Sequence, residues 1–294
     1  MQYGLAAWGL REEPLESQLA ITSGFGLDLL EFSIANYDRD VLRPGATDGE
    51  IERVKTLFRQ HGVRLECGCT GNDFTGDDVE EQVGKVIGVV DIAARLGIRY
   101  LRIFAGFSSD SVMYGERLDR MLAALKTVNA HAAAKNVVLC VETHGGVTAS
   151  PGGAQVHFNS VSTRVDRWRE LLETGVAVTY DPANLAAAGQ GEPAAFFRRF
   201  REHIPYIHLK DFRDVPGGVL PAACGEGRLD WPELMAALKE FDGPAMIEYE
   251  LTGDVRDGMR RSLDFLTFLT AYKGIYDVSK DYFHAPCQHP VFAA

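Results

Sequence analysis

The feature that most constrains the fold is a regular alternation of short apolar runs and helical patterns along the chain of 294 residues. Runs rich in apolar, β-branched or aromatic residues predict strands at 2–10, 27–33, 63–69, 99–106, 137–144, 176–181, 206–211 and 244–250. Helical periodicity predicts helices at 14–23, 47–61, 77–96, 113–135, 160–174, 193–203, 231–241 and 255–273. Alternating units of this length predict parallel strands joined by right-handed crossovers.

Eight such units favour an α/β protein with a closed (β/α)₈ TIM barrel, which typically needs about 250 residues. A doubly wound sheet is the alternative, but no G-x-G-x-x-G dinucleotide-binding pattern follows the first predicted strand. No linker or low-complexity run divides the chain. We therefore expect one barrel domain over residues 1–273, followed by an aromatic, proline-containing and packed C-terminal arm at 274–294.

Composition limits the classes of partner. The formal net charge of −11 argues against nucleic acid or an anionic membrane as the main partner, because phosphate groups are bound by basic surfaces. No run approaches the roughly 18 consecutive apolar residues of a membrane span, and the N-terminus lacks the basic segment of a signal peptide. The cysteines show neither CxxC spacing nor disulfide-scaffold density. We expect a cytoplasmic protein that is either a monomer or a homo-oligomer.

Four successive predicted strands end on side chains that can bind a metal. The segments VETHGG, TYDPAN, YIHLKDF and MIEYE place Glu142, Asp181, His208 and Glu248 at these ends. In a TIM barrel the carboxyl ends of the strands meet at the face that carries the active site. Three carboxylates and one imidazole in a partly dry cavity require a cation. This donor set suits one divalent ion, with Mn²⁺ or Mg²⁺ favoured and Co²⁺ or Zn²⁺ as alternatives.

The last of these positions has a competitor in Glu250, which has the same strand parity as Glu248. Glu248 follows the apolar run directly, so we assign the ligand role to Glu248. Further side chains are candidates for binding substrate, namely the polar His144, Asn184, Lys210 and Arg102 and the aromatic Trp8, Phe104 and Phe107. For Arg102 an internal ion pair is the alternative, and the aromatic side chains are as well suited to the core as to a pocket wall.

Five segments together resemble the xylose isomerase-like TIM barrels, a family that includes sugar isomerases and epimerases, inosose and dehydroshikimate dehydratases, and endonuclease IV. The segments are VETHGG, TYDPANLAAAG, YIHLKDF, GEGRLDW and IEYE, and the resemblance covers most of residues 1–270. HLKD alone has low specificity, whereas the five segments in this order are specific. The resemblance implies that Glu142, Asp181, His208 and Glu248 bind one divalent metal ion.

This resemblance implies an isomerase or epimerase of a sugar or keto-polyol. The metal would stabilise an enediolate, while Glu142 and Glu248 remove and return the proton next to the carbonyl. The alternative is a dehydratase of a cyclic keto-polyol or keto-acid such as inosose or dehydroshikimate, with His144 or Lys210 assisting the departing hydroxyl. A sugar-binding barrel without catalysis is a third possibility.

An AP endonuclease of the endonuclease IV type is not expected. That enzyme holds three zinc ions with the help of additional histidines. Its D-x-x-H motif corresponds here to Asp181-Pro182-Ala183-Asn184, and the third and fourth strands end in Cys-Gly-Cys and Phe-Ala-Gly. A site for three metal ions therefore lacks several of its ligands.

Overall fold

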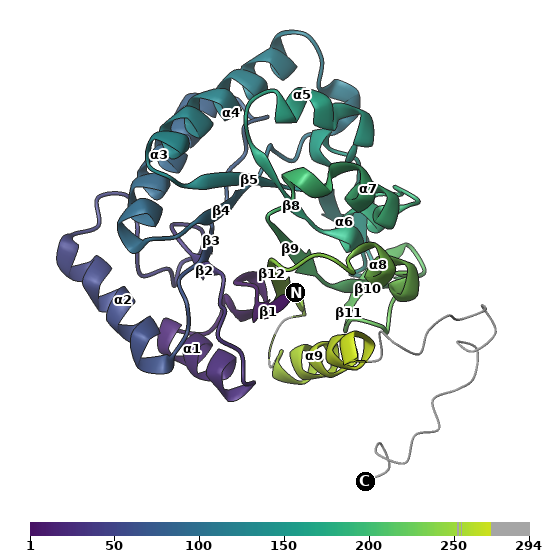
Figure 1. Ribbon diagram of the computed structural model, residues 1–294. Coiled ribbons are helices and arrows are strands. Elements are labelled where there is room, and N and C mark those ends of the chain that lie inside the picture. The colour runs from purple at the N-terminus through teal and green to yellow at the C-terminus, as the bar shows by residue number, and fades with distance from the viewer. Residues whose placement is uncertain (252, 254, 272–294) are drawn as a thin grey trace.

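The computed structural model describes residues 1–251, 253 and 255–271, and the arm predicted at 274–294 lies outside these residues. In this part of the chain, parallel strands curl into a barrel with helices around it (Figure 1). The strands are β1 (Gln2–Leu5), β2 (Phe32–Ser33), β3 (Cys67–Cys69), β4 (Tyr100–Ile103), β5 (Val138–Glu142), β8 (Ala177–Tyr180), β9 (Tyr206–Leu209) and β12 (Pro244–Ile247). Their order is β1-β12-β9-β8-β5-β4-β3-β2, which confirms the predicted TIM barrel.

The barrel closes between β1 and β2 through a short seam. The Leu5 amide donates to the Leu29 carbonyl at 3.1 Å, and the Glu31 amide donates to the Leu5 carbonyl at 2.9 Å. Leu5 and Leu30 form an isolated parallel bridge at the same place. Closure of the ring thus depends on a few backbone contacts beside Glu31.

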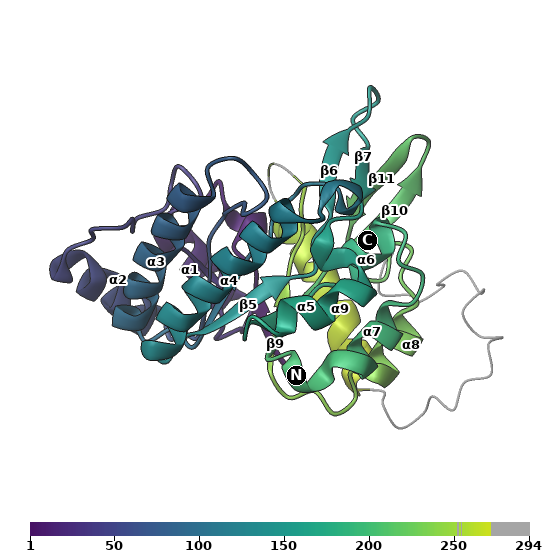
Figure 2. The ribbon, with the colours of Figure 1, turned by 90° about the horizontal axis from the view of Figure 1, so that it is seen from above.

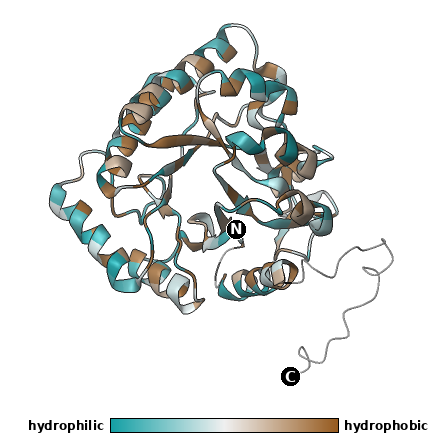
Figure 3. Ribbon diagram, in the orientation of Figure 1, coloured by the Kyte–Doolittle hydropathy of each residue, from teal (hydrophilic) through white to brown (hydrophobic). Residues whose placement is uncertain are grey.

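The helices pack their apolar sides against the strands, as the hydropathy colours of Figure 3 show. In the described residues they are α1 (Leu15–Gly24), α2 (Asp48–His61), α3 (Val79–Leu96), α4 (Glu116–Ala134), α5 (Trp168–Leu172), α6 (Pro182–Ala187), α7 (Pro193–Phe200), α8 (Trp231–Ala237) and α9 (Arg256–Ala271). At α2, Thr47 and Glu50 form a capping box, and Gly62 ends the helix in the left-handed region with φ 65°.

The first predicted strand is shorter than expected. It was predicted over 2–10, but β1 ends at Leu5 and Trp8–Leu10 form a 3₁₀ turn. The chain leaves the sheet because the Ala7 amide donates to the Glu31 side chain at 3.2 Å instead of to a neighbouring strand.

The helix predicted at 160–174 is also wrong in part. Two 3₁₀ turns, Val161–Thr163 and Val165–Arg167, precede the short α5. The hydroxyl groups of Ser160 and Thr163 form a capping box with the local backbone. Such bonds compete with the regular helical pattern, so the helix begins only at Trp168.

A second sheet, which the sequence analysis did not predict, stands on the carboxyl-terminal face of the barrel. The hairpin of β6 (Gly146–Ala149) and β7 (Gln155–Phe158) joins the hairpin of β10 (Asp211–Val215) and β11 (Gly218–Ala222) in the order β10-β11-β7-β6. Figure 2 shows both hairpins projecting from the same side of the barrel. Each hairpin follows a barrel strand that carries a predicted metal ligand, so the sheet borders the candidate site.

Candidate functional site

The four side chains predicted to bind metal converge at the carboxyl-terminal face of the barrel. Glu142 ends β5, His208 lies in β9, and Asp181 and Glu248 directly follow β8 and β12. One ligand atom from each of the four lies within 4.8 Å of the others. All four are buried, and Asp181 and His208 have no exposed surface. Among residues 1–251, 253 and 255–271, no other cluster of this kind occurs.

The backbone after β8 orients Asp181. Pro182 is the first residue of α6, and the Asp181 Oδ1 atom caps this helix by accepting from the Asn184 amide at 2.9 Å. The Asp181 amide donates to the Thr143 hydroxyl at 2.8 Å, which ties the ends of β5 and β8 together. The other carboxylate oxygen, Oδ2, forms no hydrogen bond in the described part of the chain, and Lys210 Nζ lies 3.2 Å from it as an ion-pair partner.

The two ring nitrogens of His208 face different groups. Its Nε2 atom lies 2.9 Å from Glu31 Oε1. Its Nδ1 atom lies 3.7 Å from Glu142 Oε1 and 3.8 Å from Glu248 Oε2, and no described residue forms a hydrogen bond with it. The imidazole therefore directs an unpartnered nitrogen toward the carboxylates.

Two buried cations stand beside the cluster. Arg102 Nε lies 3.2 Å from Glu142 Oε2. Arg102 therefore forms an internal ion pair, which was the alternative to its predicted role in substrate binding. Lys210 Nζ lies 2.7 Å from Glu248 Oε2, 2.5 Å from Glu250 Oε1 and 3.2 Å from Asp181 Oδ2. Both cations orient carboxylates at this site.

The cluster carries more negative charge than these cations neutralise. Burial, with Glu142 and Glu248 nearby, raises the pKa of Asp181 to about 7 despite Lys210. Burial also raises the pKa of Glu142, although Arg102 opposes it. Burial lowers the pKa of His208, but Glu31 and the neighbouring glutamates outweigh it and raise that pKa well above its usual value.

The cluster has the buried ligand atoms and the negative charge that a site for a divalent cation needs. Asp181 Oδ2 and His208 Nδ1 are buried ligand atoms that form no hydrogen bond within the described residues, and Lys210 Nζ forms an ion pair with Asp181 Oδ2 at 3.2 Å. A divalent cation would bind them and offset the surplus negative charge. Three carboxylates and one imidazole suit such an ion. The four residues could hold a metal ion.

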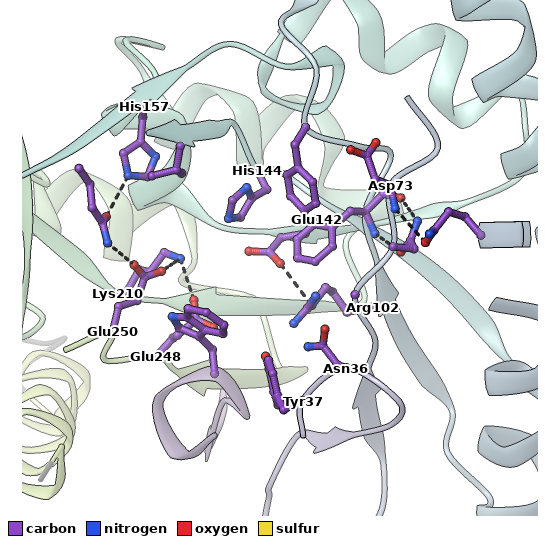
Figure 4. Close-up of a pocket in the computed structure, with 18 of the residues that line it drawn as sticks. Asn36, Tyr37, Asp73, Arg102, Glu142, His144, His157, Lys210, Glu248 and Glu250 are labelled. Carbon is purple, nitrogen blue, oxygen red and sulfur yellow. Dashed lines mark hydrogen bonds and ion pairs between the residues drawn. The ribbon is translucent and has the colours of Figure 1, made fainter. Parts of the chain in front are cut away.

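A cavity of about 500 Å³ opens above the cluster (Figure 4). Glu142, Glu248 and Lys210 form part of its floor, and Trp8, Phe104 and Phe107 contribute aromatic walls. The predicted substrate-binding residues Trp8, Phe104, His144, Lys210 and Arg102 all line the cavity. Asn184 does not line it and instead donates from Nδ2 to Glu142 Oε1 at 3.1 Å.

His144 packs edge-on against Phe104 and Phe107, with ring centroids 5.2 Å and 5.4 Å away. Its Nδ1 atom lies 2.5 Å from the Gly145 carbonyl, which requires a proton on Nδ1 because the carbonyl only accepts. Burial lowers the pKa of His144 to about 4. The neutral ring therefore offers Nε2 as a hydrogen-bond acceptor.

Sequence reasoning missed Asp211, the last residue of the HLKD segment. Its carboxylate accepts from the backbone amides of Phe212, Gly225, Gly227, Arg228 and Leu229 and from Trp231 Nε1. A Cβ atom at Gly227 would collide with Asp211 Oδ1, which explains the glycine there. The GEGRLDW segment is thus a loop folded around one buried carboxylate.

Two glutamates near the cluster were also missed or set aside. Glu31 is fully buried in the run LDLLEFS, where a lone carboxylate among apolar residues was the available signal. Glu250 binds Lys210 and lies 3.5 Å from Gln155 Nε2, which connects the site to the β6–β7 hairpin.

Comparisons with known proteins support the family resemblance. A family model described as xylose isomerase-like TIM barrel matches residues 19–269. No curated protein has a significant match to the sequence. None of the helices in the described residues is both long and apolar enough to cross a membrane.

Solved structures share the fold at low sequence identity. The probable 3-DHS dehydratase AsbF from Bacillus anthracis, involved in petrobactin synthesis, has a TM-score of 0.74 and 15% identity over 91% of this chain and 99% of that chain. The IolI protein with a bound zinc atom has a TM-score of 0.71 and 16% identity over 92% of this chain and 99% of that chain. A Methylomonas sp. D-allulose 3-epimerase in complex with D-allulose has a TM-score of 0.68 and 16% identity over 91% of this chain and 96% of that chain.

Proposed function

The chain belongs to the xylose isomerase-like TIM barrel family, and on this premise we propose that it is a divalent-metal-dependent isomerase or epimerase of a sugar or keto-polyol. The observation that carries the proposal is the convergence of Glu142, Asp181, His208 and Glu248 at one point, where Glu142 and Glu248 also line the cavity. We favour Mn²⁺ or Mg²⁺ because three of the four donors are carboxylates. A structural neighbour holds D-allulose, a ketose, which fits this substrate class.

In the proposed reaction, Glu142 and Glu248 move a proton at the carbon next to the substrate carbonyl. One glutamate accepts the proton as the C–H bond breaks, and the other donates a proton to the opposite face of that carbon or to the neighbouring carbon. A bound divalent ion would supply Lewis-acid polarisation of the carbonyl. Arg102 and Asn184 hold Glu142 for this task, and Lys210 holds Glu248. Trp8 and Phe104 offer apolar surface to the sugar ring.

A dehydratase acting on a cyclic keto-acid or keto-polyol is the second candidate. Lys210 favours it, because its ammonium group lines the cavity beside Glu248 and could protonate a departing hydroxyl. His144 is less suited to that task, because its Nδ1 proton is bonded to the Gly145 carbonyl. The fold similarity to a probable 3-DHS dehydratase is consistent with this candidate.

Exchange of substrate hydrogen with solvent tests the proposal. The Mn²⁺-loaded protein should incorporate deuterium from D₂O into at least one member of a ketose panel, observed by NMR. Glu248→Gln, measured at saturating Mn²⁺, should lower the exchange rate by roughly 10²–10⁴-fold, because it removes a general acid–base group. The control Glu173→Gln changes an exposed glutamate that pairs with Arg169 and should exchange at the wild-type rate.

The alternative outcomes separate the two candidates. Formation of a conjugated enone from a cyclic keto-acid or inosose, followed by ultraviolet absorbance, would favour the dehydratase. Absence of exchange across the ketose panel would count against the isomerase or epimerase.

A further inference from the structure

Glu31 contacts the candidate metal site through His208. It lies immediately before β2 and is fully buried. Its Oε1 atom is 2.9 Å from His208 Nε2 and accepts from the Tyr206 hydroxyl at 3.0 Å. Its Oε2 atom accepts from the Ala7 amide at 3.2 Å and is 3.9 Å from Arg102 Nη2. One carboxylate therefore contacts three different parts of the barrel.

The contact with His208 determines which ring nitrogen can bind a metal. An ionised carboxylate only accepts hydrogen bonds, so a neutral imidazole, which is the form that binds a metal, carries its proton on Nε2, toward Glu31. The lone pair of a neutral ring is then on Nδ1, the nitrogen that faces Glu142 and Glu248. A hydrogen bond to the far nitrogen of a ligating histidine fixes both its tautomer and its orientation.

The other Glu31 contacts lie on the seam where the barrel closes. The Glu31 amide donates to the Leu5 carbonyl, and its Oε2 atom accepts from the Ala7 amide. Both partners lie at or just beyond the end of β1. Because the seam has few other backbone bonds, the Glu31 side chain supplies a substantial share of the contacts between β1 and β2 there.

We propose that Glu31 is a positioning residue that fixes His208 Nδ1 toward a bound divalent ion and couples binding of that ion to closure of the barrel between β1 and β2. The inference rests on the metal site of the proposed function. Ordering His208 against an ion also orders Glu31, and with it the bonds of Glu31 to the end of β1.

Two measurements test this inference without any substrate. In the first, Mn²⁺ is titrated calorimetrically into the wild type, Glu31→Ala, Glu31→Gln and Tyr206→Phe. We expect Glu31→Ala to weaken Mn²⁺ binding by about 10–100-fold, and Glu31→Gln to weaken it less, because its amide oxygen can still accept from Nε2. Tyr206→Phe is the matched control, because it removes a hydrogen bond to the same Glu31 oxygen without changing His208. It should bind Mn²⁺ within about threefold of the wild type.

The second measurement is hydrogen–deuterium exchange of the seam amides of Leu5, Ala7 and Glu31. Addition of Mn²⁺ should slow their exchange in the wild type and in Tyr206→Phe, but not in Glu31→Ala. If Glu31→Ala does not fold, Glu31→Gln decides the test: Mn²⁺ binding weakened by about threefold or more supports the proposal, and a smaller effect overturns it.

Other results would overturn the inference. Wild-type Mn²⁺ affinity in folded Glu31→Ala would show that His208 needs no positioning by Glu31. An equal loss in Tyr206→Phe would assign the effect to general packing. A wild-type protein that binds no Mn²⁺ would remove both the metal site and this inference. A wild type that binds Mn²⁺, with the expected variant pattern, but exchanges no ketose hydrogen would refute only the proposed function.

Discussion

Asp181→Asn should lower the affinity for Mn²⁺ by more than about 100-fold, beyond the 10–100-fold typical of residues that only orient a ligand. The reason is that both Asp181 oxygens have separate tasks. Oδ1 accepts from the Asn184 amide at the start of α6, and Oδ2 is directed at the cluster, 3.2 Å from Lys210 Nζ. An asparagine has one acceptor oxygen, so either the helix cap or the metal ligand is replaced by an NH₂ group. Calorimetric titration and the metal content of the purified protein measure the effect.

A second N-cap aspartate provides the control. Asp230 accepts from the Glu233 amide at 3.1 Å at the start of α8 but lies outside the cluster. Asp230→Asn should therefore retain wild-type Mn²⁺ affinity. If Asp181→Asn bound Mn²⁺ as tightly as the wild type, the four converging side chains would not be the metal site.

Asp211→Ala should reduce the free energy of unfolding by about 3–5 kcal/mol, which is at the upper end of the effects of single substitutions. The substitution leaves five backbone amides and the Trp231 indole N–H without their shared acceptor. Since Asp211 and Trp231 are buried, water can replace only part of these bonds. Urea denaturation followed by circular dichroism measures the change.

Asp214 on the same strand β10 is the matched control. Its carboxylate is exposed and lies 3.1 Å from Arg228 Nη1. Because exposed ion pairs contribute little, Asp214→Ala should change the free energy of unfolding by less than about 1 kcal/mol. Equal destabilisation by the two substitutions would contradict the role assigned to Asp211.

The barrel and the convergence of the four side chains were predictable because both depend on local sequence patterns. Apolar periodicity marks each strand and helix, and a closed ring brings all strand ends to one face. The position of Glu142 at the end of β5 follows from that pattern alone. The partners of these residues do not follow from the local pattern, since Glu31 and His208, for example, are separated by 177 positions in the sequence. No local pattern shows that Lys210 is held by three carboxylates instead of facing solvent.

The second sheet was missed for a different reason. Its turns contain the clear signals Pro151-Gly152-Gly153 and Pro216-Gly217-Gly218, which are typical of hairpins. In the eight-unit pattern, however, the segment that forms β6 and β7 corresponds to a connecting loop, and Asp211, the first residue of β10, corresponds to the end of the seventh strand. An insertion inside a connecting loop leaves the repeat of barrel strands unchanged, so the repeat alone cannot reveal it.

The second sheet and the barrel contribute different residues to the candidate site. The β6–β7 hairpin contributes Val147, Gln155 and His157 to the cavity wall, but none of the four converging side chains. Those side chains come from the barrel strands or the residues directly after them. Replacing this hairpin by that of a relative should therefore change which molecules fit the cavity, while Glu142, Asp181, His208 and Glu248 stay in place. The shape of the cavity can therefore vary through this hairpin without any change in the barrel strands.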